Sequence, residues 1–124
     1  MTANLIEQDI ERRLREWSVN GNTASCRITF DADFSGFAGH FPGNPLVPGL
    51  CLTSIGAVMC RRLLGEKYRI VAMPRLKFSA MVRPGDTLDC TLKIIQEETL
   101  IKATFAATLQ ETPACRCRLD LERG

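Results

Sequence analysis

The chain has 124 residues, of which 45% are hydrophobic and 24% charged, and its formal net charge is +2 at pH 7. This composition is typical of one globular domain, and the small net charge, without any block of Lys or Arg, gives no indication of a nucleic-acid-binding protein. No apolar run reaches the ~18 residues that a membrane span requires.

The first segment is predicted to be a short amphipathic helix. Apolar side chains recur at helical spacing from Leu5 to Trp17, and charged residues fill the positions between them. The sequence VNGN at 19–22 breaks this helix. Because the N-terminal residues are charged where a signal peptide would be apolar, we expect a cytoplasmic protein.

A first strand is expected at residues 23–32, and a loop rich in Pro and Gly follows it. The loop contains the only histidine of the chain, His40. From Leu50 to Leu64 the residues are nearly all apolar until Arg61, which predicts a helix buried almost all round. Gly65 is well placed to end that helix.

Beyond this helix the pattern is typical of strands. Residues 67–82 form a long stretch with a kink expected at Pro74, 87–96 and 100–109 form a hairpin, and 115–122 alternate apolar and charged side chains. We therefore predict an α+β domain in which an antiparallel sheet of about five strands wraps around one central helix. Residues 1–22 form an N-terminal helix and turn, and residues 23–124 form the core of this single domain.

Neither a metal nor a cofactor is expected. The six cysteines contain no C-x-x-C pair, and only one histidine is available as a further ligand. We expect reduced thiols that act mostly as small apolar core residues. No Gly-rich phosphate loop lies between a strand and a helix.

The Pro/Gly loop is the most promising place for chemistry. Gly49 lies where the buried helix begins, so unpaired backbone N–H groups and the positive end of the helix dipole should face the loop that carries His40. Such a terminus can polarise a carbonyl oxygen, and an imidazole beside it can remove a proton from the neighbouring carbon. The alternative is a structural histidine that is hydrogen-bonded within a rigid loop.

Two motifs carry a resemblance to a known family. The sequence GHFPGNPLVPG at 39–49 resembles the loop that precedes the central helix in β-hydroxyacyl-(acyl-carrier-protein) dehydratases of fatty-acid synthesis, and MPRLKFSAMVRPGDTL at 73–88 is similar to a strand of the same family. The resemblance covers residues 24–122 and implies the hotdog fold. The absence of a Pro-His-rich N-terminal segment makes the chain more similar to the short, stand-alone members found in specialised lipid or polyene pathways.

The resemblance implies roles for individual residues. His40 would be the base that takes the C2 proton of a 3-hydroxyacyl thioester, Gly49 would hold the thioester carbonyl through its N–H, and Pro48 would fix the turn. The family has an acidic residue one turn into the helix, where this chain has Ser54. The acyl group would contact Phe37, Phe41, Pro48 and Leu50, with Phe34 as a further candidate for lining an acyl tunnel.

Because residue 54 is a serine, the sequence does not identify the group that would protonate the leaving hydroxide. A serine hydroxyl is too weak an acid to protonate a leaving hydroxide by itself. The alternatives are a water held by Ser54, His40 acting as base and then acid, Asp31 or Asp33 reaching in from the preceding strand, or lost activity. Two other functions therefore stay in view: a hotdog thioesterase, in which Ser54 and His40 position water on the thioester, and a non-catalytic subunit that binds an acyl carrier and is paired with an active paralogue.

The expected partners are an acyl carrier protein or an acyl-CoA thioester and a second copy of the chain. A five-stranded sheet leaves an exposed edge, so we expect a homodimer or a higher oligomer, and in the family the histidine and the acid meet across the dimer interface. An acidic carrier would be steered by a cationic group of side chains, for which the sequence offers Arg61, Arg62, Lys67, Arg75, Lys77 and Arg83.

Overall fold

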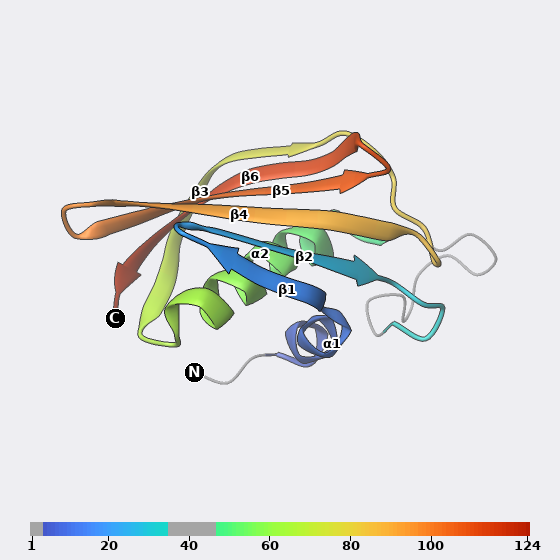
Figure 1. Ribbon diagram of the computed structural model, residues 1–124, viewed down its shortest axis with the longest axis horizontal. Helices are drawn as coiled ribbons and strands as arrows, with labels where there is room; N and C mark the ends of the chain where they lie inside the picture. Colours follow the sequence, from blue (N-terminus) through green and yellow to red (C-terminus); the bar gives the residue numbers. More distant parts are fainter. Residues whose placement is uncertain (1–3, 35–46) are drawn as a thin grey trace.

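A computed structural model of the chain describes residues 4–34 and 47–124. Within them, two helices and six strands follow one another in the order α1 (Leu5–Arg13), β1 (Arg15–Asn20), β2 (Thr23–Thr29), α2 (Gly49–Leu64), β3 (Tyr68–Phe78), β4 (Thr87–Glu97), β5 (Leu100–Leu109) and β6 (Thr112–Arg123). The strands form one antiparallel sheet in the order β1-β2-β4-β5-β6-β3, and the sheet arches over α2 (Figure 1). This is the predicted sheet around a central helix, with one strand more than expected.

The additional strand comes from the segment predicted to be the end of the first helix. Helix α1 begins after Asn4, whose side chain accepts a hydrogen bond from the Glu7 N–H at 2.8 Å, and it ends at Arg13 instead of continuing to Trp17. Residues 15–20 instead pair with β2. The sequence VNGN is thus a hairpin turn, with Gly21 at φ 62°, because Asn-Gly between two extended segments favours tight strand reversal over a simple helix stop.

Helix α2 is the centre of the core. Its side chains at Ile55, Val58 and Met59 are fully buried, and its Gly56 lies against Phe105 and Leu119 of the sheet. A Cβ atom at position 56 would be 3.1 Å from the Cγ atom of Phe105, so the missing side chain lets the helix approach the sheet closely. The helix ends at Gly65, as predicted, with φ 85° and its N–H donated to the Arg61 carbonyl oxygen.

The strands after α2 follow the predicted pattern. In β6 the side chains of Cys115, Cys117, Leu119 and Leu121 are buried beneath the sheet, and Arg116 is exposed on the other face. β4 and β5 form the predicted hairpin, with Cys90 opposite Ala107. Pairing of β3 with β6 is irregular between Ile70 and Arg75, the region that contains Pro74.

All six cysteines are free and buried, as expected for small apolar core residues. Burial raises the pKa of the Cys60 thiol to about 12, so this thiol stays protonated at neutral pH. Among the residues of 4–34 and 47–124, no helix is long and apolar enough to cross a membrane.

Candidate active site

The start of α2 is built by Pro48 and Gly49. Pro48 is the residue before the helix, and its carbonyl oxygen accepts hydrogen bonds from the N–H groups of Cys51 at 2.9 Å and Leu52 at 3.3 Å. Among the described residues, no side chain caps this end, and none accepts a hydrogen bond from the N–H groups of Gly49 and Leu50. These two donors and the positive end of the helix dipole can bind an oxygen that carries partial negative charge.

Ser54 lies one turn into α2, at the position where the resemblance predicts an acid. Its hydroxyl donates to the Leu50 carbonyl oxygen at 2.9 Å, and the neighbouring Thr53 hydroxyl donates to the same oxygen at 2.8 Å. Both hydroxyl protons are therefore held by the helix backbone, a common arrangement for Ser and Thr within helices. Since residues 49–65 contain no Asp or Glu, this segment supplies no carboxylic acid to the site.

The two aspartates named as alternative proton donors, Asp31 and Asp33, form ion pairs at the surface. Arg13 of α1 forms ion pairs with Asp31 at 3.4 Å and with Asp33 at 3.1 Å. The side chains of Asp31 and Asp33 are 70% and 82% exposed. Both carboxylates thus serve as anions in a surface network around Arg13, which argues against either of them as the proton donor.

A wall of the site comes from β3, which the sequence did not single out. A Cβ atom at position 49 would be 2.7 Å from Cζ and 2.8 Å from Cε2 of the Phe78 ring. The ring therefore covers the Cα atom of Gly49, and only glycine leaves room for it. The one available signal was that Phe78 stands within the second motif, which the resemblance assigned to a strand.

This contact leads to a prediction about Gly49→Ala. The added methyl group must push the Phe78 ring away from α2, and we expect a loss in the free energy of unfolding of about 1 kcal/mol, the lower end of the cost of overpacking. In a Phe78→Leu background, Gly49→Ala should lower the free energy of unfolding only slightly, because the aromatic ring is absent. Urea unfolding of the four chains measures the coupling, and strictly additive effects would contradict the contact.

Several predicted site residues lie outside the described residues. His40, Phe37 and Phe41 fall in 35–46, so their roles remain predictions. Leu50 lies at the start of α2, among the described residues, and 76% of its surface is exposed. Phe34 is fully buried against Phe30, with 4.6 Å between ring centroids, which is a core position.

A cysteine nucleophile is an unsuitable alternative at this site. Cys51 lies in the first turn of α2, but only 3% of its surface is exposed. Burial raises the pKa of its thiol, which lowers the fraction of reactive thiolate. We therefore do not assign an acyl-enzyme step to this residue.

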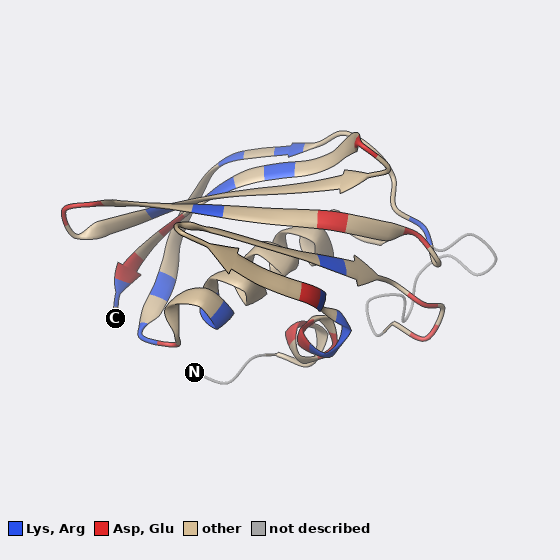
Figure 2. Ribbon diagram, in the orientation of Figure 1, with Lys and Arg blue, Asp and Glu red and all other residues tan. Residues whose placement is uncertain are grey.

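The structure separates the cationic side chains that the sequence grouped together. Arg61 pairs with Glu7 at 3.4 Å, and the Nε atom of Arg62 donates to Glu11 at 2.9 Å. These pairs connect α2 to α1, so the charges of Arg61 and Arg62 are largely neutralised. Arg75 and Lys77 instead lie on β3. Figure 2 shows Lys and Arg positions, in blue, along β3 and along its neighbour β6.

Comparison with known proteins identifies the family. The model of the ApeI-like family, described as ApeI dehydratase, matches residues 16–117. The chain belongs to this dehydratase family. It is also 32% identical over 118 residues to the 3-hydroxyacyl-[acyl-carrier-protein] dehydratase FabZ of Oenococcus oeni, an alignment that covers 89% of this chain and 84% of the relative. The FabZ of Levilactobacillus brevis is 31% identical over 111 residues, covering 80% of this chain and 72% of the relative.

Solved structures confirm the hotdog fold. The dehydratase heterocomplex ApeI:P from Xenorhabdus doucetiae superposes with a TM-score of 0.78 and 22% identity, covering 89% of this chain and 96% of that chain. The PaaI protein of Escherichia coli superposes with a TM-score of 0.72 and 17% identity, covering 95% of this chain and 89% of that chain. At these identities the likeness shows the fold of the ApeI-like chain, and its chemistry has to be argued from its residues.

Proposed function

We propose that this ApeI-like chain is a (3R)-hydroxyacyl-acyl-carrier-protein dehydratase that acts on acyl thioesters in fatty-acid or related lipid or polyene biosynthesis. The observation that carries the proposal is the open start of α2 at Gly49, directly after the loop motif that contains His40. The FabZ relatives act, by their printed name, on 3-hydroxyacyl groups linked to a carrier protein. We propose a cytoplasmic location, and a carrier-linked or CoA-linked thioester as substrate.

In the proposed reaction, the imidazole of His40 removes a proton from C2 of the 3-hydroxyacyl thioester. The electron pair of that C–H bond first moves toward the thioester carbonyl oxygen, which gives an enolate. It then forms the C2–C3 double bond as the C3–O bond breaks, and the hydroxyl group leaves as water after it receives a proton. Negative charge that develops on the thioester carbonyl oxygen is stabilised by the Gly49 N–H and the α2 dipole. The products are an enoyl thioester and one water molecule.

The proton for the leaving hydroxyl group is the distinctive part of this site. The Ser54 hydroxyl is hydrogen-bonded to the Leu50 carbonyl, and Asp31 and Asp33 are paired with Arg13. We therefore assign both proton transfers to His40, which returns the C2 proton to the departing oxygen. This assignment conserves the proton count and requires no further acid.

The test is turnover of a 3-hydroxyacyl pantetheine thioester by the purified chain. We expect a conjugated enoyl thioester, which is detected by its ultraviolet absorbance. The reverse reaction, hydration of the enoyl thioester, should be accelerated to the same extent, because a catalyst leaves the equilibrium unchanged. A chain that accelerates neither direction has no dehydratase activity by itself.

A second candidate is a non-catalytic subunit that is paired with a different, active chain. The observation that favours it is the serine at position 54, where the resemblance predicts an acid. The Xenorhabdus doucetiae structure is by its title a heterocomplex. In that case the chain binds acyl thioesters without turnover. Release of free acid, in contrast, would identify a thioesterase.

We also propose that the chain forms a homodimer through β3. This strand is one edge of the sheet, and the side chains of Ile70, Leu76 and Phe78 on it are 38%, 47% and 45% exposed. Leu50 and Met81 add exposed apolar surface beside it. The opposite edge, β1, carries mainly polar side chains and an irregularity at Arg15–Ser18, both of which discourage edge pairing.

Two matched variants test this interface. Leu76 and Ile95 are both 47% exposed, but only Leu76 lies on β3. We expect the wild type and Ile95→Glu to be dimers at micromolar concentration by light scattering, and Leu76→Glu to be monomeric, because a desolvated carboxylate opposes pairing. A monomeric wild type, or a dimeric Leu76→Glu, would place the interface elsewhere or remove it.

A further inference from the structure

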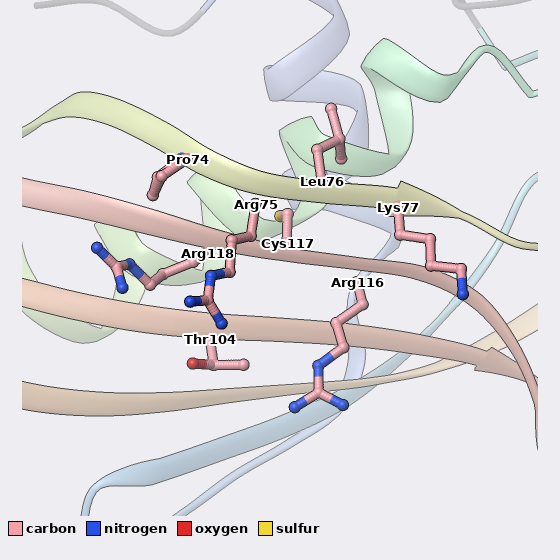
Figure 3. A pocket seen from close by; sticks show the side chains of 8 residues that line it. All are labelled: Pro74, Arg75, Leu76, Lys77, Thr104, Arg116, Cys117 and Arg118. Carbon is pink, nitrogen blue, oxygen red and sulfur yellow. The ribbon is translucent and has the colours of Figure 1, made fainter.

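Four cations gather on the outer face of the sheet, where β3 pairs with β6. They are Arg75 and Lys77 of β3 and Arg116 and Arg118 of β6, and they line a hollow of about 460 Å³ together with Thr104 and Pro74 (Figure 3). Leu76 and Cys117 point to the other side of the sheet, toward α2 (Figure 3). The strict alternation of strands thus places every charge of this stretch on the same face.

The register sets these cations against one another. Arg75 lies directly opposite Arg118, and Lys77 lies directly opposite Arg116. Like charges at opposed positions of antiparallel strands destabilise the sheet. The spacing of Arg75 and Lys77 along the chain places them together, but only the strand register places a cation of β6 opposite each of them.

The positive charges of these four side chains are only partly balanced by carboxylates of the described residues. Arg118 is paired with Asp120 at 2.9 Å, whereas Arg75, Lys77 and Arg116 have no ion pair with any residue that the structure describes. No carboxylate lines the hollow. The positive potential of this surface is therefore directed outward, where it attracts an acidic partner before contact.

We propose that this outer-face cationic quartet is the docking surface for an acidic acyl carrier protein. The inference rests on the proposed function, which requires a carrier-linked substrate. Besides the four cations, the hollow is lined by Thr104, Pro74, Leu76 and Cys117, of which Leu76 and Cys117 point toward α2 in Figure 3. Because charged side chains dominate this lining and no described aromatic side chain belongs to it, an acidic protein is a better occupant than a lipid surface.

The quartet lies close to the candidate active site along β3. Lys77 is followed directly by Phe78, whose ring lies against Gly49 at the start of α2. The docking surface and the candidate active site therefore lie on the two sides of the same strand end. The cations point away from the plane of the sheet, so edge-to-edge pairing of β3 leaves them accessible.

Because of this strand register, the double variant Arg75→Glu/Arg116→Glu tests carrier docking separately from the stability of the sheet. Each substitution converts a like-charge pair into an opposite-charge pair, with Arg118 and with Lys77 respectively. We expect the variant to resist urea at least as well as the wild type. Its affinity for the apo form of a bacterial acyl carrier protein should nevertheless fall about tenfold or more at low ionic strength.

A matched control has the same change in net charge at the opposite end of β3. Lys67 and Arg123 are exposed residues beside the first position of the strand. Lys67→Glu/Arg123→Glu should bind the apo carrier within roughly twofold of the wild type if location decides binding. Equal losses in both double variants would mean that only net charge acts, and unchanged binding by Arg75→Glu/Arg116→Glu would overturn the proposal.

Two further measurements separate this proposal from the proposed function and from a membrane partner. Turnover of a small acyl pantetheine thioester should be the same in the wild type and in Arg75→Glu/Arg116→Glu, because such a substrate needs no docking. Absent turnover with carrier binding intact would remove the dehydratase assignment and retain the docking surface. Wild-type binding to vesicles of anionic phospholipid, without binding to the apo carrier, would overturn the docking proposal.

Discussion

The variant His40→Ala is expected to lose dehydration almost completely. A positioned general base or acid contributes about 10²–10⁴-fold to a rate, and His40 carries both proton transfers in the proposed mechanism. Exchange of the C2 proton of a bound acyl thioester with deuterium oxide should stop as well. Because this exchange precedes C–O cleavage, it reports the base separately from the leaving group.

The interpretation of His40→Ala depends on an intact fold. Circular dichroism and urea unfolding should match the wild type, and His40→Gln provides a control that retains a polar side chain without a comparable base. Partial recovery of His40→Ala by added imidazole would support a chemical role for the ring. Unchanged exchange and turnover in a folded His40→Ala chain would make the histidine structural, which is the alternative that the sequence left open.

The second large effect is expected from Ser54→Glu. This substitution places a carboxyl group at the helix position where the family resemblance has an acid, and it also removes the hydrogen bond to the Leu50 carbonyl. If the missing acid limits dehydration, the rate should rise, by up to ~10²–10⁴-fold for a well-placed donor. Ser54→Gln, which has similar length and no acidic proton, should show no such gain.

A carboxyl group at position 54 should lower the stability of the fold and favour proton donation. Ser54 is partly buried, so an unpaired carboxylate there should lower the free energy of unfolding. Burial raises the pKa of a carboxyl group, and the higher pKa keeps more of it in the protonated form that donates. A fast wild type that Ser54→Glu slows would contradict the view that the serine limits the reaction.

The sequence predicted the larger elements of the fold because their patterns are long and consistent. Helix α2 is apolar nearly all round, and β6 alternates without interruption, so each has one reasonable interpretation. The start of β1 was missed because Leu14 and Trp17 continue the helical spacing of α1 by coincidence. Pairing with β2 through the turn at Gly21 outweighs that local pattern, and such pairing is decided by tertiary contacts.

For the candidate site, the sequence indicated His40 and Gly49, which stand in the first motif, and Ser54, which lies one turn into the helix that follows it. It could not show that the Ser54 proton is held by the Leu50 carbonyl, or that Asp31 and Asp33 are engaged by Arg13. It also placed Arg61 and Arg62 on a carrier surface, although both are paired with α1. These facts depend on which distant segments come together, and residue spacing alone does not contain them.

The most direct test of the dehydratase assignment is the mass of the acyl group after the purified wild type is incubated with a 3-hydroxyacyl carrier protein. We predict that the carrier keeps its acyl group and that this group loses the mass of one water molecule. The same experiment with His40→Ala should leave the 3-hydroxyacyl group intact. Release of a free hydroxy acid, or a wild type that binds the carrier and leaves its acyl group unchanged, would contradict the account.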